Sequence, residues 1–451
     1  MTTDSDPQGG PVPSTADSAG GPVPPSAQVP PAASTTSAAS VAPAAPAPQT
    51  SAAPIHPALS RKGTGISADG EFYMPTRVLF GRGIAGQAAE HVAALGASSI
   101  LLVTDPGVRS AGLVAPVERA LVTSGIEVTI FDQVEPNPKD TDCLAGAELM
   151  RAGGQPALVA VGGGSSIDTA KCIGLLLTNG GHPRDWEDFG ALRHDPLPVI
   201  AIPTTAGTGS EVSPSAVITD TDRKKKMNLF DPRNCPRIAL VDPDLTFSCP
   251  PAVTAAAGMD AMSHAIDSLQ CLLATPASDA LALEGARLVA KYLRRAYTDP
   301  TDVEARCGMA QGSLTAGLAV GLTDVSGAHA LAEAMGALYG HPHGYCCAVS
   351  LPPIMKYNLP VSAEKYARLA FALDAGEPRA SEGELAQAAI DAITELNRIL
   401  EIPTMSELIR AEDLDILAEK AVRNTSTPSN PRAADAAAYR QMFASEISTV
   451  S

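Results

Sequence analysis

The pattern of hydrophobic and polar positions between residues 70 and 247 alternates short apolar runs with stretches of helical periodicity. Short apolar runs that end at charged or turn residues are typical of buried parallel strands. The predicted strands are 72–81, 99–105, 127–131, 157–161, 199–202 and 238–242, and the helices between the earlier ones are 84–95, 111–124 and 140–152. A hairpin is predicted at 217–227. Strands that alternate with helices predict a parallel sheet that binds its ligand at the carboxyl ends of the strands.

The second half of the chain has a different pattern. From residue 248 onwards Ala and Leu recur at helical spacing, and no strand pattern is present. The predicted helices are 252–274, 276–297, 302–320, 326–338, 362–374, 382–400 and 410–423, with a last helix after the cap at 430–432. We therefore predict an α/β domain over 70–247 followed by an all-helical domain over 248–451.

The first 69 residues differ from both halves in composition. They are rich in Pro, Ala, Ser, Thr and Gly, and no Lys or Arg precedes Arg61. Such a segment buries too little apolar surface to offset the entropy lost on ordering, so residues 1–69 are predicted to be a disordered tail. It lacks the basic and apolar regions of a secretory signal and the arginines of a mitochondrial presequence. A partner-binding arm remains the functional alternative.

Composition and charge narrow the class of protein further. The 451 residues are 45% hydrophobic and carry a formal net charge of −17, which argues against nucleic acid or an anionic membrane as a partner. No apolar run approaches the roughly 18 residues needed to cross a bilayer. The eight cysteines form no paired CxxC spacings, which favours reduced thiols in a cytoplasmic enzyme over a disulfide framework.

A glycine-rich loop follows the strand predicted at 157–161. Consecutive glycines allow close approach of a ligand, and the helix that follows offers free N–H groups and a positive dipole end, which suit a pyrophosphate. The candidate contact residues are Gly162, Gly163, Gly164, Ser165, Ser166 and Asp168. The stretch does not match GxGxxG, so an ordinary strand-to-helix turn is the alternative.

Two further strand ends carry candidate cofactor contacts. Asp105 follows an earlier strand, where a carboxylate could accept hydrogen bonds from ribose hydroxyls and would repel a 2′-phosphate. Its alternative role is a helix cap before Pro106. Thr204 and Thr205 lie in a hydroxyl- and glycine-rich loop after the strand at 199–202, and this loop can donate several hydrogen bonds to a phosphate or a ribose.

Four potential metal ligands lie in the helical half. Asp260 and His264 are four residues apart, which places both side chains on one face of a predicted helix. His329 lies near the start of another helix-like run, and His343 follows a turn at 340–342. One carboxylate with imidazoles suits Fe(II) or Zn(II) better than Mg or Ca. A lone histidine is more often a satisfied core residue, but four polar residues in apolar helices favour a site.

These motifs, in this order, resemble those of the iron-containing (group III) alcohol dehydrogenases over roughly residues 72–445. The motifs are the glycine-rich loop, Thr-Thr-Ala-Gly-Thr-Gly-Ser-Glu at 204–211, Gly-Met-Asp-Ala-x-x-His at 258–264 and Pro-His-Gly at 342–344. The resemblance implies an N-terminal dinucleotide-binding α/β domain and a C-terminal all-helical domain, with the active site between them.

The resemblance also implies cofactors and roles for single residues. Fe(II), or alternatively Zn(II), would be held by Asp260, His264, His329 and His343. The loop at 162–168, Thr204, Thr205, Asn137 and Lys226 fall at positions that contact the nucleotide in the family. Asp105 matches the acid that favours NAD(H) over NADP(H). A homo-oligomer is expected.

One position departs from the family pattern. Members commonly carry a histidine four residues after the third metal ligand, whereas this chain has Glu333 there, and an additional His341 precedes His343 by two residues. Glu333 or His341 could serve as the acid–base group, or Glu333 could select a different substrate.

The expected activity is metal-assisted hydride transfer between NAD(H) and a small alcohol or aldehyde. A glycerol-dehydrogenase-like polyol oxidoreductase, a dehydroquinate-synthase-like lyase and a reductase of a phosphonate- or sulfonate-bearing aldehyde remain alternatives. A protein that binds NAD and metal without turnover is a further one. The sequence does not specify the substrate.

Overall fold

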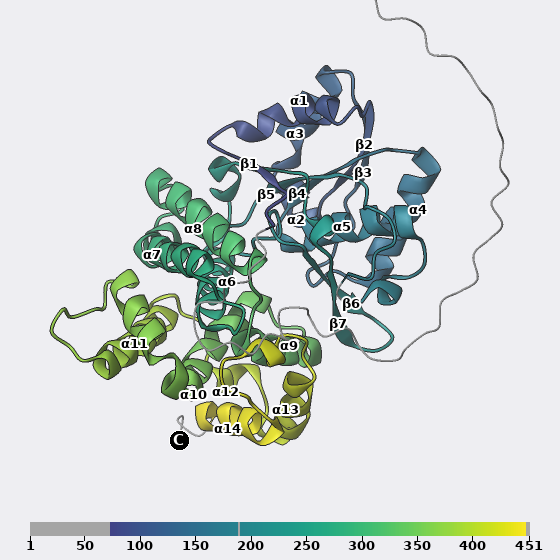
Figure 1. The fold of residues 1–451 in the computed structure, drawn as a ribbon. Helices are drawn as coiled ribbons and strands as arrows, with labels where there is room; N and C mark the ends of the chain where they lie inside the picture. The colour runs from purple at the N-terminus through teal and green to yellow at the C-terminus, as the bar shows by residue number, and fades with distance from the viewer. Residues whose placement is uncertain (1–72, 188–189, 448–451) are drawn as a thin grey trace, which may run out of the picture. The chain divides into compact units, whose positions relative to one another are not determined.

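The computed structural model describes residues 73–187 and 190–447 (Figure 1). The prediction for the tail at 1–69 lies outside the described residues. In the described part, the chain changes from alternating strands and helices to helices alone after Val241.

Six parallel strands form the main sheet of the described residues, in the order β1-β8-β5-β4-β2-β3. The strands are β1 (Arg77–Phe80), β2 (Ser99–Val103), β3 (Glu127–Phe131), β4 (Leu158–Gly162), β5 (Val199–Pro203) and β8 (Ile238–Val241). The remaining two, β6 (Ser215–Asp220) and β7 (Lys225–Phe230), pair antiparallel as a separate hairpin. The first strand is shorter than the predicted 72–81, of which residue 72 lies outside the described residues.

Helices cover both faces of the sheet, and the strands are accordingly apolar at nearly every position. Ile100 and Leu102 of β2 pack into one core with α1 and α3, whereas Leu101 and Val103 pack into another with α4 and α5. These helices are α1 (Ala88–Ala94), α3 (Val114–Thr123), α4 (Asp140–Gly153) and α5 (Gly164–Asn179). The successive side chains of a strand point to opposite faces, so burial on both faces removes the polar alternation. The predicted parallel sheet is confirmed.

The winding of the sheet reverses between β2 and β4. From β2 the chain moves to β3 at one edge, and from β4 it moves through β5 towards β8. Ligands of such sheets bind outside the carboxyl ends of the strands at this reversal. Asp105, which follows β2, and the glycine loop, which follows β4, therefore lie at the place that the topology favours for a nucleotide.

The second half is helical, as predicted. Its helices are α6 (Pro251–Gln270), α7 (Pro276–Thr298), α8 (Val303–Gly321), α9 (Gly327–Tyr339), α10 (His343–Ala372), α11 (Glu382–Ile399), α12 (Met405–Leu408), α13 (Leu414–Val422) and α14 (Ala436–Ile447). Their apolar faces share one core, which contains Met262, Leu331 and Ile354. None of the described helices is long and apolar enough to cross a membrane.

The extent of α10 corrects the prediction of a helix at 362–374. The helix begins at His343 and runs for 30 residues through Pro352, Pro353 and Pro360. A proline inside a helix costs about 3 kcal/mol, so the sequence pattern favoured a later start. Pro352 and Pro353 are buried, and α10 packs against α6, α9 and α11, so tertiary burial outweighs the local penalty.

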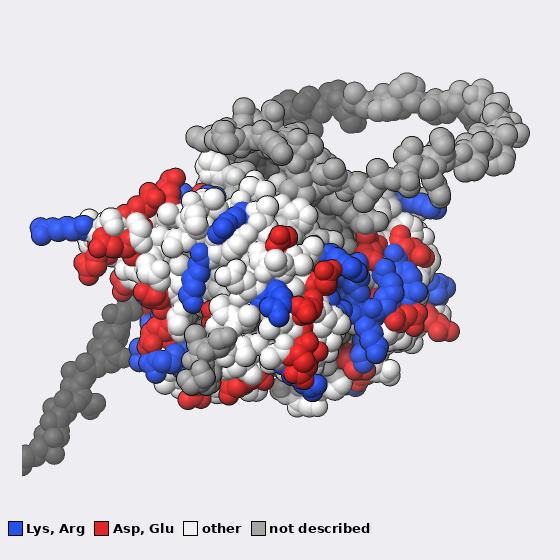
Figure 2. Space-filling model, turned by 90° about the horizontal axis from the view of Figure 1, so that it is seen from below, with Lys and Arg blue, Asp and Glu red and all other residues white. Residues whose placement is uncertain are grey.

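The lysine run at the hairpin turn has two roles. Lys224 takes a left-handed conformation with φ 49°, and Lys225 pairs with Glu187 at 2.5 Å on the surface. Such exposed pairs contribute about 0–1 kcal/mol. Figure 2 shows acidic and basic side chains interspersed on one face of the molecule. Lys226, the next residue, instead lines the cavity at the start of α5.

One close backbone contact fixes the first turn of α10 and, with it, His343. A Cβ atom on Gly344 would lie 2.0 Å from the carbonyl oxygen of Ala256 in α6, a contact that only glycine avoids. Glycine at this position therefore permits α10 to begin directly against α6.

We predict that Gly344→Ala lowers the free energy of unfolding by about 1–3 kcal/mol, because the extra methyl group forces α10 away from α6. Gly383→Ala is the matched control, since a Cβ there meets nothing within 4 Å and alanine favours the helix. Chemical denaturation of both variants measures the difference. Equal free energies of unfolding for the two variants would contradict the close contact between Gly344 and Ala256.

Candidate metal and cofactor site

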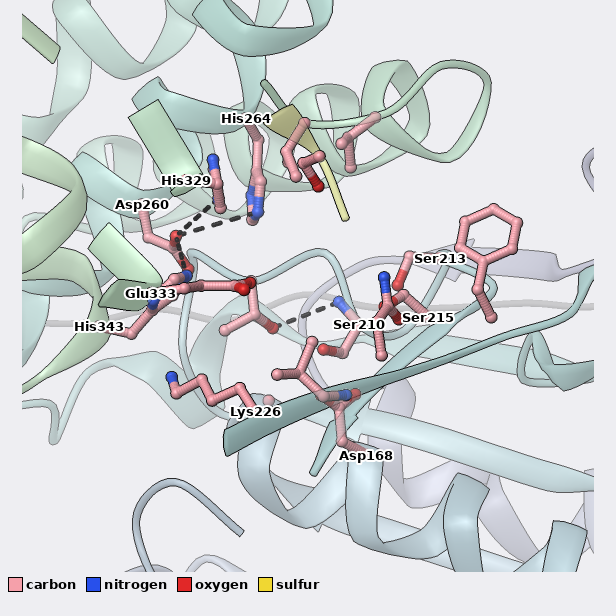
Figure 3. A pocket seen from close by; sticks show the side chains of 18 of the residues that line it. Asp168, Ser210, Ser213, Ser215, Lys226, Asp260, His264, His329, Glu333 and His343 are labelled. Atoms are coloured by element: carbon pink, nitrogen blue, oxygen red, sulfur yellow. Dashed lines mark hydrogen bonds and ion pairs between the residues drawn. The ribbon is translucent and has the colours of Figure 1, made fainter. Parts of the chain in front are cut away.

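Of the four predicted metal ligands, the three histidines converge on one carboxylate oxygen of the fourth, Asp260. The Oδ1 atom of Asp260 lies 3.9 Å from Nε2 of His264, 3.9 Å from Nε2 of His329 and 3.6 Å from Nε2 of His343. Asp260 and His264 are one turn apart on α6, while His329 comes from α9 and His343 is the first residue of α10 (Figure 3). Three helices thus present one oxygen and three nitrogen atoms to a common centre.

The protonation of two of these three imidazoles suits metal binding. Burial, with the nearby His329, lowers the pKa of His264, and burial with Lys226 lowers the pKa of His343 to about 3, although Asp260 opposes both shifts. Both rings are therefore neutral at neutral pH, the form that ligates a metal. The rings of His264 and His329 stack with centroids 5.0 Å apart.

Asp267 holds His329 in the required orientation, and sequence reasoning missed it. Its Oδ2 atom lies 2.8 Å from Nδ1 of His329, and both carboxylate oxygens accept hydrogen bonds from Ser326. Asp267 also accepts from the backbone N–H of His329, so it caps the N-terminus of α9 from the neighbouring helix. Burial raises the pKa of Asp267, but the bonds to His329 and Ser326 outweigh it and leave the pKa below its ordinary value.

The outer hydrogen bonds leave the ligand atoms free. His329 donates Nδ1–H to Asp267, and the Nδ1 atom of His264 lies 3.3 Å from the carbonyl oxygen of Gly207, which fixes both rings with Nε2 unprotonated. The buried atoms Oδ1 of Asp260 and Nε2 of His329 have no hydrogen-bond partner. Buried polar atoms without partners are costly, so these residues fit a divalent cation.

Cys347 is a further potential ligand that the sequence did not single out. The ligand atoms of Asp260, His329, His343 and Cys347 all lie within 4.8 Å of one another. The Sγ atom of Cys347 lies 3.5 Å from Nε2 of His343, one turn earlier on α10. The spacing of four residues after His343 was the available signal.

A cavity of about 180 Å³ adjoins the ligand cluster. Its walls come from the start of α5, the loop after β5, the β6–β7 hairpin and the helices α6, α8, α9 and α10. The cavity is therefore bounded both by the half of the chain that forms the parallel sheet and by the helical half.

Part of the predicted nucleotide loop lines this cavity. Gly164, Ser165 and Asp168 at the start of α5 are lining residues. A Cβ on Gly164 would lie 2.7 Å from Thr208, so the glycine loop and the threonine loop touch. The N-terminus of α5 faces the cavity with the free N–H groups that favour an anion.

The remaining predicted loop residues lie directly behind this wall. Thr205 lies 3.3 Å from the position of a Cβ on Gly163, and Thr204 donates its backbone N–H to the carbonyl of Gly162. Ser166 donates to Asp105 at 3.2 Å. The structure thus brings the ends of β2, β4 and β5 together.

Asp105 caps a helix and also lies beside the predicted nucleotide loop. It is the N-cap of a short helix, α2 (Pro106–Ser110), and accepts from the backbone of Val108 at 2.9 Å. Its other oxygen accepts from Ser166 of the nucleotide loop. A capping role and a position beside the loop are therefore compatible.

Asp168 is a buried anchor as well as a lining residue. It accepts from the backbone of Val217 and lies 3.6 Å from the fully buried Lys171. Lys171 donates to the carbonyls of Ser213 and Ser215, so this pair holds the first strand of the hairpin against α5. Burial raises the pKa of Asp168 and lowers that of Lys171.

Two predicted contacts come from the opposite side of the nucleotide loop. Asn137, in the left-handed region at φ 56°, and Lys226 of β7 both line the cavity. Thr219 of β6 donates its backbone N–H to Pro138, which ties the segment of Asn137 to the hairpin.

The structure separates the two residues considered for acid–base chemistry. Glu333 lines the cavity and accepts from Asn424 at 2.5 Å. His341 is not among the lining residues. Its Nε2 atom lies 2.7 Å from the carbonyl oxygen of Leu408, and its ring lies 5.5 Å from that of Tyr339. The structure does not bring His341 to the site.

Comparison with known families matches both halves of the chain. Residues 75–243 match the family described as iron-containing alcohol dehydrogenase, and residues 254–447 match the C-terminal region of the Fe-containing alcohol dehydrogenase family. The two matches together cover the sheet, the ligand cluster and the cavity between them.

Individual proteins agree with this assignment. A choline dehydrogenase of Bacillus subtilis is 40% identical over 82% of this chain and 94% of its own length. An NAD-dependent methanol dehydrogenase of Bacillus methanolicus is 37% identical over 80% of this chain and 96% of its own. A crystal structure of a 1,3-propanediol oxidoreductase is 36% identical, with a TM-score of 0.82 over 84% of this chain and all of that one. The chain belongs to the iron-containing alcohol dehydrogenase family.

Proposed function

We propose that the protein is a metal-dependent, NAD(H)-linked alcohol dehydrogenase or aldehyde reductase that acts on a small alcohol or aldehyde. The observation that carries this proposal is the convergence of three imidazoles on Oδ1 of Asp260 at the wall of the cavity that the nucleotide loop also lines. A metal centre and a nucleotide site that share one cavity fit hydride transfer to or from a bound substrate.

The ion is Fe(II), with Zn(II) as the alternative, and Asp260, His264, His329 and His343 hold it. A divalent ion at this position acts as a Lewis acid towards an alcohol or carbonyl oxygen. Asp267 and the carbonyl of Gly207 fix the tautomers of two ligands, so the site is organised before a substrate arrives.

NAD(H) is the proposed hydride carrier, supported by the NAD-dependent methanol dehydrogenase among the relatives. The start of α5 provides N–H groups for the pyrophosphate, and Asn137 and Lys226 close the opposite side of the cavity. Asp105 lies beside the loop, where its charge disfavours the 2′-phosphate of NADP(H).

Two further features belong to this proposal. The eight free cysteines support a location in the reducing cytoplasm. The exposed side chains of Phe80 in the edge strand β1 and of Tyr73 and Met74 just before it support a homo-oligomer.

The direct test is reduction of a panel of small aldehydes by protein loaded anaerobically with Fe(II), or separately with Zn(II), and followed by loss of NADH absorbance. We expect turnover that is lost on chelation and returns with one of the two ions. The proposed function would be contradicted by a protein that binds NADH and metal but neither reduces any of the aldehydes nor oxidises any small alcohol in the reverse direction.

We predict that Asp267→Asn weakens metal binding by about ten- to a hundredfold, because His329 loses the partner that fixes its tautomer. Metal titration of the purified variant gives the affinity. Asp279→Asn is the matched control, a buried carboxylate of the same helical half that pairs with Lys365 and Arg368 instead. Unchanged affinity in Asp267→Asn would remove the positioning role.

We predict that Asp105→Ser raises kcat/KM with NADPH relative to NADH by about tenfold, which corresponds to roughly 1.4 kcal/mol of removed repulsion. Serine retains the helix cap, so the change isolates the charge. Asp302→Ser at the N-cap of α8 is the control and leaves the ratio unchanged. An unaltered ratio in Asp105→Ser would show that Asp105 acts only as a cap.

A further inference from the structure

The cavity beside the metal ligands is lined by more carboxylates than cationic side chains. Among the described residues its lining contains Asp168, Asp260, Asp324 and Glu333, but Lys226 is the one Lys or Arg. The chemistry of a small substrate depends on which of these charges is available to it.

Three of the four carboxylates are committed to the protein. Asp168 pairs with Lys171, and Asp260 faces the three imidazoles. Asp324 accepts from the hydroxyl of Ser429 at 2.6 Å and from the backbone of Val325 at 2.8 Å. Burial raises the pKa of Asp324 to about 6, so what commits this carboxylate to the protein is its two hydrogen bonds and not the loss of its charge.

Glu333 is the remaining carboxylate. It is half-buried, its Oε2 atom accepts from the neutral amide of Asn424 at 2.5 Å, and it forms no ion pair with a described residue. Figure 3 shows the side chain extending from α9 into the cavity. One turn separates Glu333 from the ligand His329, so their Cβ atoms are about 5–6 Å apart.

Lys226 does not neutralise Glu333. Its Nζ atom lies 3.6 Å from the position of a Cβ on Gly336, which is three residues further along α9, and no ion pair joins it to Glu333. The cation therefore lies against the turn of α9 next to Glu333, without forming an ion pair with its carboxylate. A partly desolvated carboxylate without a cationic partner favours a ligand that supplies one.

We propose that Glu333 selects the substrate, and that the preferred substrate is a short alcohol carrying an ammonium group two or three atoms from its hydroxyl. This inference rests on the proposed function. With the hydroxyl at the ligand cluster, one helical turn brings the ammonium group to Glu333. A neutral alcohol gains nothing from this carboxylate, and an anionic aldehyde is repelled by it.

The reaction leaves the cationic group unchanged. The alcohol carbon loses one hydride to NAD⁺ and its hydroxyl loses one proton to solvent, which gives the aldehyde, NADH and H⁺. Glu333 contributes binding through the ammonium group and does not take part in the bond changes. A carboxylate in this role lowers KM for cationic alcohols more than it raises kcat.

A pair of isosteric alcohols tests the proposal. Choline and 3,3-dimethylbutan-1-ol have the same shape and differ in the charge of one atom. We expect the metal-loaded wild-type enzyme to show a kcat/KM for choline at least about tenfold above that for the neutral isostere. The quaternary ammonium of choline has no N–H to donate, so the difference measures its charge attraction to the carboxylate.

Glu333→Gln is then expected to lower kcat/KM for choline by about ten- to a hundredfold, mainly through KM, and to change that for the neutral isostere far less. Glu333→Asp retains the charge and recovers part of the preference. Glu284→Gln, which removes a surface carboxylate paired with Arg287 on α7, is the control and leaves the ratio unchanged.

Two results would overturn the selection role. Equal kcat/KM for choline and its isostere in the wild type excludes a cationic preference. An equal loss on both substrates in Glu333→Gln, with a shifted pH profile, assigns Glu333 to proton transfer instead.

Calorimetric titration of choline into the metal-loaded protein separates this inference from the proposed function. Choline that binds without oxidation of any alcohol contradicts the dehydrogenase alone, whereas oxidation of other alcohols without choline binding contradicts the selection alone.

Discussion

The site depends on how one buried carboxylate is satisfied. Asp267 has no exposed surface, so each of its oxygens needs donors from the protein. It takes them from Ser326, from the first turn of α9, from the Nδ1 atom of His329 and from the amide of Gln270. The same bonds that make burial tolerable set the start of a helix and the tautomer of a ligand. Folding of the core and organisation of the metal site are therefore one event.

A second constraint joins the two halves at the same place. The carbonyl oxygen of Gly207 lies 3.3 Å from Nδ1 of His264, and a Cβ on this glycine would lie 2.6 Å from the carbonyl of Ala257. Gly207 belongs to the threonine loop that contacts the glycine loop through Thr208. A change in the nucleotide loops therefore reaches a metal ligand through two contacts. This arrangement brings candidate ligands from the sheet half and the helical half of the chain to one cavity without a separate linking element.

The sequence was sufficient where function depends on local spacing, and insufficient where it depends on partners distant in the chain. Buried strands can be predicted because they are short apolar runs. Asp260 and His264 can be predicted as a pair because they are one helical turn apart. Asp267 has the same one-turn relation to His264, but its partner His329 is 62 residues away, so its role needs tertiary contacts. The start of α10 was missed because local proline penalties were overruled by burial. His341 was overvalued because proximity in sequence to His343 does not place its ring in the cavity.

The position of His343 at the first residue of α10 has a thermodynamic consequence. The helix contains three internal prolines, which remove backbone hydrogen bonds, and its N-terminus has no side-chain cap. An ion bound by His343 would therefore hold an end of this 30-residue helix that has no side-chain cap. Any free energy of ion binding that is absent in the unfolded chain becomes stability of that element. An ion held at this site would then stabilise the helical half as well as serve the proposed chemistry, and its removal would loosen α10 at the end nearest the cavity.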